Sequence, residues 1–365
     1  MGFERTQVAN FGAGPAALPT SVLEKAQREL LNFHGTGMSI MEMSHRHAAY
    51  SELQERTEQL FRELLNIPSN YKVLFLQGGA SLQFSMIPMN FLTEGKTASY
   101  LMTGSWSEKA FKEAQMIGEA RMTASSKELG YREIPEVDES AWVASDAYVH
   151  LTSNNTIIGS QWQSYPQTGD VPLIADMSSD ILSRPIPVSQ FGLIYAGAQK
   201  NLGPSGVTVV VIREDLLERN RRDIPTMLRY DIHAKNDSRY NTPPTLAVYL
   251  LGLVMEWAKE QGGVAEISAK NAVKARLVYQ TIDESQGFYN GYVNSNSRST
   301  MNVTFRLQDE DLEKLFLTEA KSAGLIGLGG HRSVGGCRAS LYNAVALEDC
   351  QRLVEFMKSF QAQHS

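Results

Sequence analysis

The sequence predicts an α/β fold, in which a mostly parallel sheet carries helices on both faces and a smaller C-terminal α+β domain follows. Six short apolar runs bounded by Gly, Ser or Asn predict the strands, at 73–76, 98–102, 147–151, 171–175, 193–196 and 207–212. Five of them are apolar almost throughout, which is typical of strands covered on both faces. Helix-like segments lie between several of the runs, as in parallel sheets built from strand–helix–strand units.

Composition limits the classes of function. The chain has 365 residues with 42% apolar and 20% charged side chains, which is typical of a folded globular protein. Its net charge is −6 and its basic residues are scattered, so we expect no nucleic-acid partner. The longest apolar stretch, 246–255, is about half of the ~20 residues that span a membrane, so we expect no membrane partner. Two cysteines are too few for a disulfide framework, and with no leader peptide evident we expect a cytoplasmic location.

Two helices are predicted before the first strand. A capping box, Ser21-x-x-Glu24, indicates the start of the first helix, whose apolar positions include Leu23, Leu30 and Leu31. A second apolar pattern at helical spacing covers 53–65 and stops before Pro68.

A glycine pair divides the chain. Gln261-Gly262-Gly263 follows an apolar helix and predicts a hinge, which gives a large domain at 16–262 and a small C-terminal domain at 263–365. We expect the N-terminal segment 1–15 to join the small domain. Near the C-terminus, Cys350 shares one helical stripe with apolar residues up to Phe360, so we expect a core cysteine rather than a nucleophile.

Chemically useful residues follow the predicted strands, where open parallel sheets bind ligands. Gln77-Gly78-Gly79-Ala80-Ser81 precedes a helix and either cradles a phosphate or forms a plain tight turn. Trp106 is either a ring-stacking residue or a core tryptophan, and Thr156, after Asn154-Asn155, bonds a ring hydroxyl or belongs to a turn.

An acid and a lysine follow the next two strands. Asp176 ends one apolar run, and buried carboxylates are rare unless they are paired. Lys200 lies in a small-residue loop after the following run, where a desolvated amine can bond to a carbonyl, although a single lysine is more often a surface residue. A phosphate cradle, a stacking aromatic, an acid for a ring nitrogen and a reactive lysine together describe a pyridoxal phosphate site.

The sequence resembles the class V, fold type I family of pyridoxal-phosphate aminotransferases over nearly its whole length. The stretches that carry the resemblance are NFGAGPA at 10–16, EMSHR at 42–46, IYAGAQKN at 194–201, YNTPPT at 240–245 and GHRSVGGCRAS at 330–340.

The resemblance implies the cofactor, pyridoxal 5′-phosphate, and the residues that bind it. Lys200 would form the Schiff base and then move the substrate proton, and Asp176 would keep the pyridine nitrogen protonated. Trp106 would stack on the ring, and Thr156 would hold its 3-oxygen. The phosphate would be bound by Ala80, Ser81 and Gln199, together with Asn241 and Thr242 of a second subunit. These last two assignments require a homodimer.

The resemblance also implies cations for dicarboxylate and phosphorylated substrates. Arg338 would bind the α-carboxylate. The second anionic group would be surrounded by His45, Arg46, His331 and Arg332, some of them across the dimer interface. Some family members carry an arginine at the position of Ser81, and the effect of this difference is left open.

The implied reaction transfers an amino group from L-glutamate to 3-phosphohydroxypyruvate, giving 2-oxoglutarate and O-phospho-L-serine with ping-pong kinetics. This is a reaction of serine biosynthesis. The related oxo acid 3-hydroxy-2-oxo-4-phosphonooxybutanoate, of vitamin B6 synthesis, is equally compatible with the sequence. The alternative within the family is serine–pyruvate transamination.

Other classes fit less well. Cysteine desulfuration needs a mobile thiol, and neither Cys337 nor Cys350 is placed for that role. The glycines at 327–330 begin like a dinucleotide-binding motif but do not open the first strand–helix unit. His45-x-His47 has no further ligand nearby, so we expect no metal. A non-catalytic binding module would keep its function in a Lys200→Ala variant.

Overall fold

A computed structural model describes residues 4–219 and 221–365. The segment 1–15, predicted to join the small domain, is described from residue 4 onward, and 1–3 lie outside the described residues. The strands are β1 (Ala9–Asn10), β2 (Tyr71–Leu76), β3 (Thr97–Met102), β4 (Ala120–Ser125), β5 (Asp146–Thr152), β6 (Leu173–Asp176), β7 (Leu193–Gly197), β8 (Thr208–Arg213), β9 (Asn290–Gly291), β10 (Asn302–Arg306), β11 (Leu325–Ile326) and β12 (Cys337–Ser340). The helices are α1 (Thr20–Glu29), α2 (Ala48–Leu65), α3 (Gly79–Phe91), α4 (Ser105–Ile117), α5 (Glu214–Glu218), α6 (Tyr230–Lys235), α7 (Thr245–Glu260), α8 (Gly263–Asp283), α9 (Glu310–Ser322) and α10 (Leu347–His364).

The main sheet confirms the predicted α/β architecture. In the part of the chain that the structure describes, its seven strands run in the order β2-β8-β7-β6-β5-β3-β4. Neighbours from β7 to β4 are parallel, whereas β8 is antiparallel to both β2 and β7. All six predicted runs fall on strands, but β4 was not predicted. It is an edge strand whose side chains are mostly half-buried, so it lacks the continuous apolar run that marks the others.

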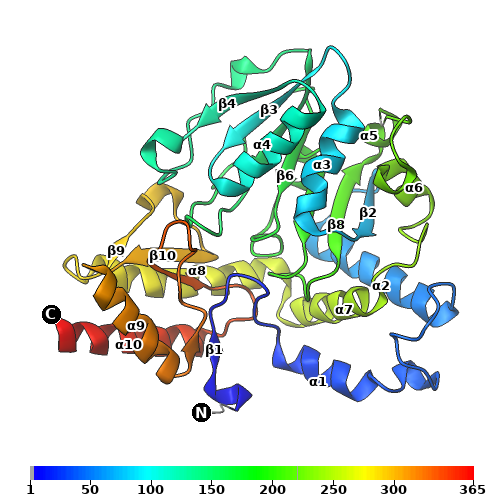
Figure 1. The fold of residues 1–365 in the computed structure, drawn as a ribbon. Helices are drawn as coiled ribbons and strands as arrows, with labels where there is room; N and C mark the ends of the chain where they lie inside the picture. The colour runs from blue at the N-terminus through cyan, green and yellow to red at the C-terminus, as the bar shows by residue number, and fades with distance from the viewer. Residues whose placement is uncertain (1–3, 220) are drawn as a thin grey trace.

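Both faces of the sheet are covered by helices (Figure 1). Leu74 and Tyr195 pack with α3 and α4 on one face. Phe75 and Ile194, their neighbours along the strands, pack with α2 and α7 on the other. Because successive strand residues point to opposite faces, two apolar layers require the unbroken apolar runs seen in the sequence.

The first two helices differ in how well their limits were predicted. The prediction of a capping box at the start of the first helix is wrong, because α1 begins at Thr20, directly after Pro19, and has no side-chain cap. Since α1 ends at Glu29, Leu30 and Leu31 lie beyond it and are exposed rather than buried. The second helix is confirmed as α2, which ends at Leu65 with Asn66 in the left-handed conformation.

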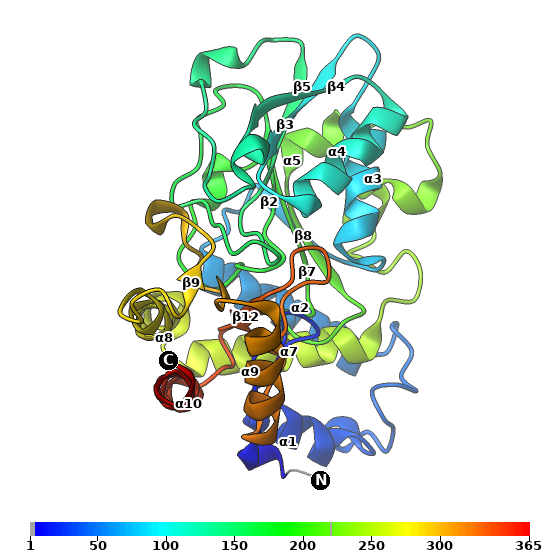
Figure 2. The ribbon, with the colours of Figure 1, turned by 60° about the vertical axis from the view of Figure 1, so that its left-hand side comes forward.

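A second sheet lies in the C-terminal part of the chain. Strands β12, β10 and β9 are antiparallel neighbours. The apolar side of α10, from Cys350 to Phe360, is buried in a separate core with residues of α8 and α9, as its stripe predicts. Figure 2 shows α9 and α10 on the side of this unit remote from the main sheet. Burial raises the pKa of the Cys350 thiol to about 12, in agreement with a structural cysteine.

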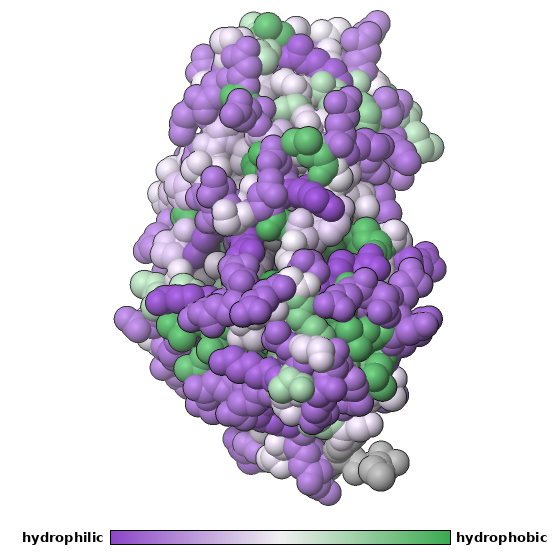
Figure 3. All heavy atoms as spheres, turned by 90° about the vertical axis from the view of Figure 1, so that its left-hand side faces the viewer, coloured by the Kyte–Doolittle hydropathy of each residue, from purple (hydrophilic) through white to green (hydrophobic). Residues whose placement is uncertain are grey.

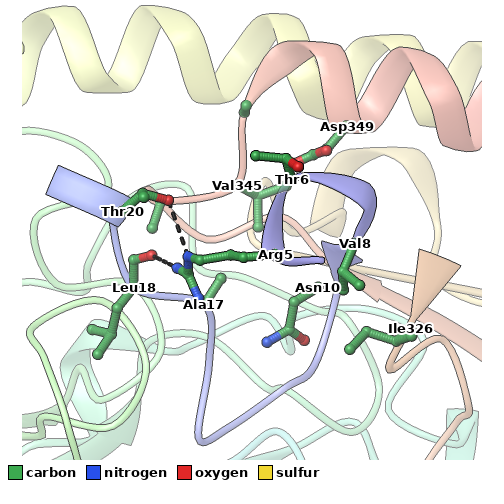
Figure 4. Close-up of a pocket in the computed structure, with 12 residues that line it drawn as sticks. Arg5, Thr6, Val8, Asn10, Ala17, Leu18, Thr20, Ile326, Val345 and Asp349 are labelled. Atoms are coloured by element: carbon green, nitrogen blue, oxygen red, sulfur yellow. Dashed lines mark hydrogen bonds between the residues drawn. The ribbon is translucent and has the colours of Figure 1, made fainter. Parts of the chain in front are cut away.

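The N-terminal segment forms a separate two-stranded sheet with the C-terminal part of the chain. Strand β1 pairs in parallel with β11, so residues near the start of the chain lie in the C-terminal unit. Arg5 donates hydrogen bonds to the Leu18 carbonyl and the Thr20 hydroxyl, and these bonds hold the chain where it leads into α1. Figure 4 shows them beside a hollow next to the start of α10. Between these anchors, Gly14 reaches the main sheet, where an added Cβ would lie 3.4 Å from Lys200 Cγ.

One face of the molecule is shown as a surface in Figure 3. The face in Figure 3 is mostly hydrophilic, and its hydrophobic areas are small and separate. Among the described helices, none has the length and apolar character needed to cross a bilayer.

Candidate active site

A cavity of about 290 Å³ lies at the carboxyl ends of the parallel strands. It brings together most of the predicted site residues, although they come from distant parts of the sequence. Those that line it are Ala80, Ser81, Trp106, Thr156, Asp176, Gln199, Lys200, His331 and Arg338.

Lys200 and Asp176 form the charged pair at the base of the site. Asp176 ends β6, and Lys200 follows the adjacent strand β7. Burial lowers the pKa of the Lys200 ammonium to about 8, against the opposing effect of the Asp176 carboxylate. Burial also raises the pKa of Asp176, while Ser178 and the Lys200 charge oppose that rise. The pair thus combines a readily deprotonated amine with an acid that needs a cationic partner.

Ser178 holds the Asp176 carboxylate in place. Its backbone N–H and its hydroxyl both donate to Asp176 Oδ1, at 2.9 and 2.6 Å. The hydroxyl oxygen in turn accepts a hydrogen bond from the Gly197 N–H at the end of β7. Both side-chain bonds go to one carboxylate oxygen, which leaves Oδ2 for a donor in the cavity.

Trp106 forms one wall of the cavity. It lies in the first turn of α4, and its Nε1–H donates to Thr156 Oγ1 at 3.0 Å. The Lys200 Nζ is 5.8 Å from the centre of the Trp106 ring. The indole plane is therefore fixed beside the reactive amine.

The start of α3 forms an anion-binding wall. Gly78 and Gly79 have φ values of 89° and 66°, which glycine adopts readily, and they turn the chain from β2 into the helix. Gly79, Ala80 and Ser81 all line the cavity. The backbone N–H groups of a first helical turn lack intrahelical acceptors and carry partial positive charge, which favours a phosphate.

Arg338, on β12, is the main cation of the cavity. It is half-buried, and its Nη1 donates to the Thr156 carbonyl at 2.8 Å while its Nε is buried without a partner. Among the described carboxylates, none lies within ion-pair distance of it. Burial lowers its pKa. An unpaired, half-buried guanidinium fits an anionic substrate.

His331 lies beside these cations at the mouth of the cavity. Burial and then the charges of Arg338, Arg332 and Lys109 lower the pKa of its imidazole. Arg332 itself is exposed in the adjacent loop and does not line the cavity.

Four further predicted residues lie outside the cavity of this single chain: His45, Arg46, Asn241 and Thr242. Asn241 donates to the side chain of Gln77, at 3.4 Å, and Gln77 donates to the Thr242 carbonyl. The segments containing His45 and Asn241 are close together, because Thr245 donates to the Ile40 carbonyl.

Among the residues in or beside the cavity, Thr152, Ser178 and Lys109 were not predicted. Thr152 is buried, lines the cavity and has an unpartnered hydroxyl. Ser178 could have been found from its place two residues after a strand-end aspartate, a spacing typical of a side-chain-to-backbone turn. Lys109 follows Trp106 by one helical turn, and no sequence signal distinguishes it from a surface lysine. No group of three or more potential metal ligands occurs among the described residues.

Comparisons with known proteins agree with this geometry. Residues 8–353 match the family model described as aminotransferase class-V. A phosphoserine aminotransferase of Lysinibacillus sphaericus (strain C3-41) is 60% identical over 355 residues, which cover 97% of this chain and 98% of that protein. The solved phosphoserine aminotransferase from Bacillus circulans subsp. alkalophilus is 55% identical with a TM-score of 0.95, covering 98% of this chain and 99% of that one. The PLP-bound enzyme from Trichomonas vaginalis is 40% identical with a TM-score of 0.90, covering 96% and 99%.

Proposed function

The chain belongs to the aminotransferase class-V family, and we propose that it is a phosphoserine transaminase whose reaction is carried by the residues of this one cavity. It transfers an amino group from L-glutamate to 3-phosphohydroxypyruvate, giving 2-oxoglutarate and O-phospho-L-serine. The observation that carries the proposal is the meeting of Lys200, Asp176, Trp106 and the start of α3 around one cavity, with the unpaired Arg338 opposite.

The cavity residues fit pyridoxal phosphate in three ways. The free N–H groups at the start of α3 suit its phosphate. The buried Asp176 has an unused oxygen for a protonated ring nitrogen. The unpartnered hydroxyl of Thr152 leaves a polar group that a bound ligand can satisfy. We assign the phosphate to Ala80, Ser81 and Gln199, the ring face to Trp106, and the 3-oxygen to Thr156.

When bound, the cofactor supplies an aldehyde that exchanges one amine for another and a ring that withdraws electrons from the substrate Cα. Lys200 supplies the attachment and the base. With its pKa lowered to about 8, a useful fraction of Nζ is unprotonated near neutral pH, so it takes the proton from the substrate Cα and later returns it. Asp176 keeps a proton on the ring nitrogen, and Ser178 fixes the carboxylate in the orientation that this requires.

Arg338 binds the α-carboxylate of each substrate. Its guanidinium already donates to the Thr156 carbonyl and keeps further donors for an oxyanion. Arg332 provides positive charge, and His331 a ring N–H donor, for the second anionic group, which both glutamate and phosphoserine carry. One site therefore accepts both amino donors in turn, as ping-pong exchange requires.

We propose that the active unit is a homodimer. Asn241 and Thr242 would reach the phosphate site of the second subunit, and His45 and Arg46 its substrate site. Two exposed apolar residues flank these positions, Met41 at 56% and Tyr240 at 47% exposure, and burial of such side chains favours association. Since both cysteines are free thiols, we place the enzyme in the cytoplasm.

The test is an absorbance spectrum of the purified protein with bound cofactor. L-Glutamate should remove the band of the lysine-bound cofactor, and 3-phosphohydroxypyruvate should restore it. A band that does not change on addition of L-glutamate would contradict the proposed transaminase activity. Restoration of the band by pyruvate alone would favour serine–pyruvate transamination.

A further inference from the structure

Lys109 is an unpaired cation next to the cavity. It lies on α4, one turn after Trp106, and its Nζ is 4.3 Å from the centre of the Trp106 ring. The side chain is exposed. Among the described residues no carboxylate lies within 4 Å of this Nζ, whereas five other described lysines form ion pairs. Its charge is therefore available to a ligand.

The packing of α3 against α4 places Ser81 and Lys109 at the same end of these two helices. Ser85 on α3 donates to Glu113 on α4 at 2.7 Å, so these two residues mark facing sides of the helices. Four residues earlier on each helix, the same facing sides carry Ser81 and Lys109. Both helices begin at the cavity, which Ser81 lines, so Lys109 stands across from an uncharged residue at its mouth.

The electrostatic environment agrees with this position. Lys109 is one of the three cations, with Arg338 and Arg332, whose charge acts on the His331 imidazole. Lys109 comes from the large sheet's helices, whereas the other three groups come from the C-terminal part of the chain. The positive charge thus reaches the cavity mouth from two sides.

We propose that Lys109 binds the phosphate of the phosphorylated substrate and makes the enzyme prefer it over substrates whose second anionic group is a carboxylate. This inference rests on the proposed function and adds a specificity-determining residue to it. A phosphate monoester carries up to two negative charges near neutral pH, whereas the γ-carboxylate of glutamate carries one. An additional cation recognises this additional negative charge, and the uncharged Ser81 on the facing helix cannot serve as that cation.

The test compares two half-reactions of the cofactor-loaded enzyme, with O-phospho-L-serine and with L-glutamate. We expect Lys109→Met to lower kcat/KM for O-phospho-L-serine on the order of 20-fold, mostly through KM, because a charge-assisted contact made in both ground and transition states is lost. The value for L-glutamate should change less than about 3-fold by the same reasoning, since glutamate lacks the second charge. Lys109→Arg should keep most of the preference. Lys112→Met, an exposed lysine one turn further along α4, is the matched control and should change neither value.

Moving the positive charge from α4 to α3 distinguishes two possible roles of Lys109, binding the substrate phosphate and supporting the Trp106 ring. In the double variant Ser81→Arg/Lys109→Ser, the cation moves from α4 to the facing position on α3. Because Ser81 is also assigned to the cofactor phosphate, the variant is assayed at cofactor occupancy matched by absorbance, and we then expect most of the preference for O-phospho-L-serine to return. Equal losses with both substrates in Lys109→Met, without recovery in the double variant, would overturn the inference and assign Lys109 a structural role. Direct binding gives a second readout: inorganic phosphate, titrated calorimetrically into the loaded enzyme, should bind more weakly to Lys109→Met. Failure of the unmodified enzyme to convert O-phospho-L-serine would instead overturn the proposed function, and this inference with it.

Discussion

Ser178 donates two hydrogen bonds to the carboxylate of Asp176, from its backbone N–H at 2.9 Å and from its hydroxyl at 2.6 Å. The same hydroxyl accepts a bond from the Gly197 N–H at the end of the neighbouring strand, so the carboxylate is tied to β7 as well as β6. These bonds favour the anionic form of a carboxyl group whose pKa burial raises, and they fix its orientation.

Removing the Ser178 hydroxyl should reduce activity without unfolding the protein. In Ser178→Ala the carboxylate loses a donor that lowers its pKa, so the anion is less favoured and less well oriented. We expect kcat to fall on the order of 10-fold, the usual effect of losing a hydrogen bond to a charged group. Ser183→Ala is the control, because that buried hydroxyl donates only to the Asp180 carbonyl. Steady-state kinetics measure kcat for both variants. Equal losses of kcat in Ser178→Ala and Ser183→Ala would contradict the role of Ser178.

The lowered pKa of Lys200 predicts how cofactor capture depends on pH. Only the unprotonated amine attacks the aldehyde, so the rate of capture by cofactor-free protein should rise with pH through a midpoint of about 8, rather than near the ordinary lysine value of 10.5. Because the Asp176 charge raises this pKa, Asp176→Asn should move the midpoint to lower pH. Stopped-flow absorbance after addition of pyridoxal phosphate measures both, and a midpoint near 10 would refute the prediction.

The proposed dimer predicts complementation between two inactive variants. Lys200→Ala lacks the amine, and Asn241→Ala/Thr242→Ala lacks the residues donated to the partner. A mixed dimer has one intact site, so a refolded equimolar mixture should recover about a quarter of the normal activity if subunits pair at random. Each variant refolded alone gives the baseline. Activity no higher than that baseline would show that the sites are not shared.

Lys274 should stabilise the C-terminal unit. Its buried ammonium on α8 donates to the carbonyls of Leu341, Tyr342 and Val345, at 2.8–3.0 Å. Lys274→Met keeps much of the side-chain volume but leaves these acceptors without their donor, and we expect a loss of about 3 kcal/mol in the free energy of unfolding. Urea denaturation measures it. The exposed Lys270→Met should shift stability by less than about 0.5 kcal/mol, and equal shifts in the two variants would argue against the prediction.

The sheet was predictable where burial leaves a local pattern. Each strand covered on both faces is a short apolar run, whereas β4 at the edge is half-exposed and has none. The antiparallel direction of β8 was not predictable, because strand composition does not encode direction. Leu30 and Leu31 misled the helix prediction, since apolar residues beyond the end of a helix look like part of its buried stripe.

The site was predictable to the extent that it follows strands. Asp176, Lys200 and the glycine turn at Gly78 stand directly after apolar runs, and the carboxyl ends of parallel strands meet at one edge. Lys109 and Thr152 could not be found in this way, because their proposed roles follow only from their three-dimensional surroundings. An exposed lysine on a helix and a threonine at a strand end have many equivalents in any sequence.

The pairing of β1 with β11 has a consequence for how the protein is made. Residues 9 and 10 pair with residues 325 and 326, and an added Cβ at Gly14 beyond them would lie 3.4 Å from Lys200 Cγ. A chain emerging from the ribosome therefore holds β1 without its partner strand until residues 325 and 326 have been translated. Arg338 emerges later still. A nascent chain, or one terminated before residue 338, thus presents no complete pocket, because Lys200 and Arg338 line the same cavity.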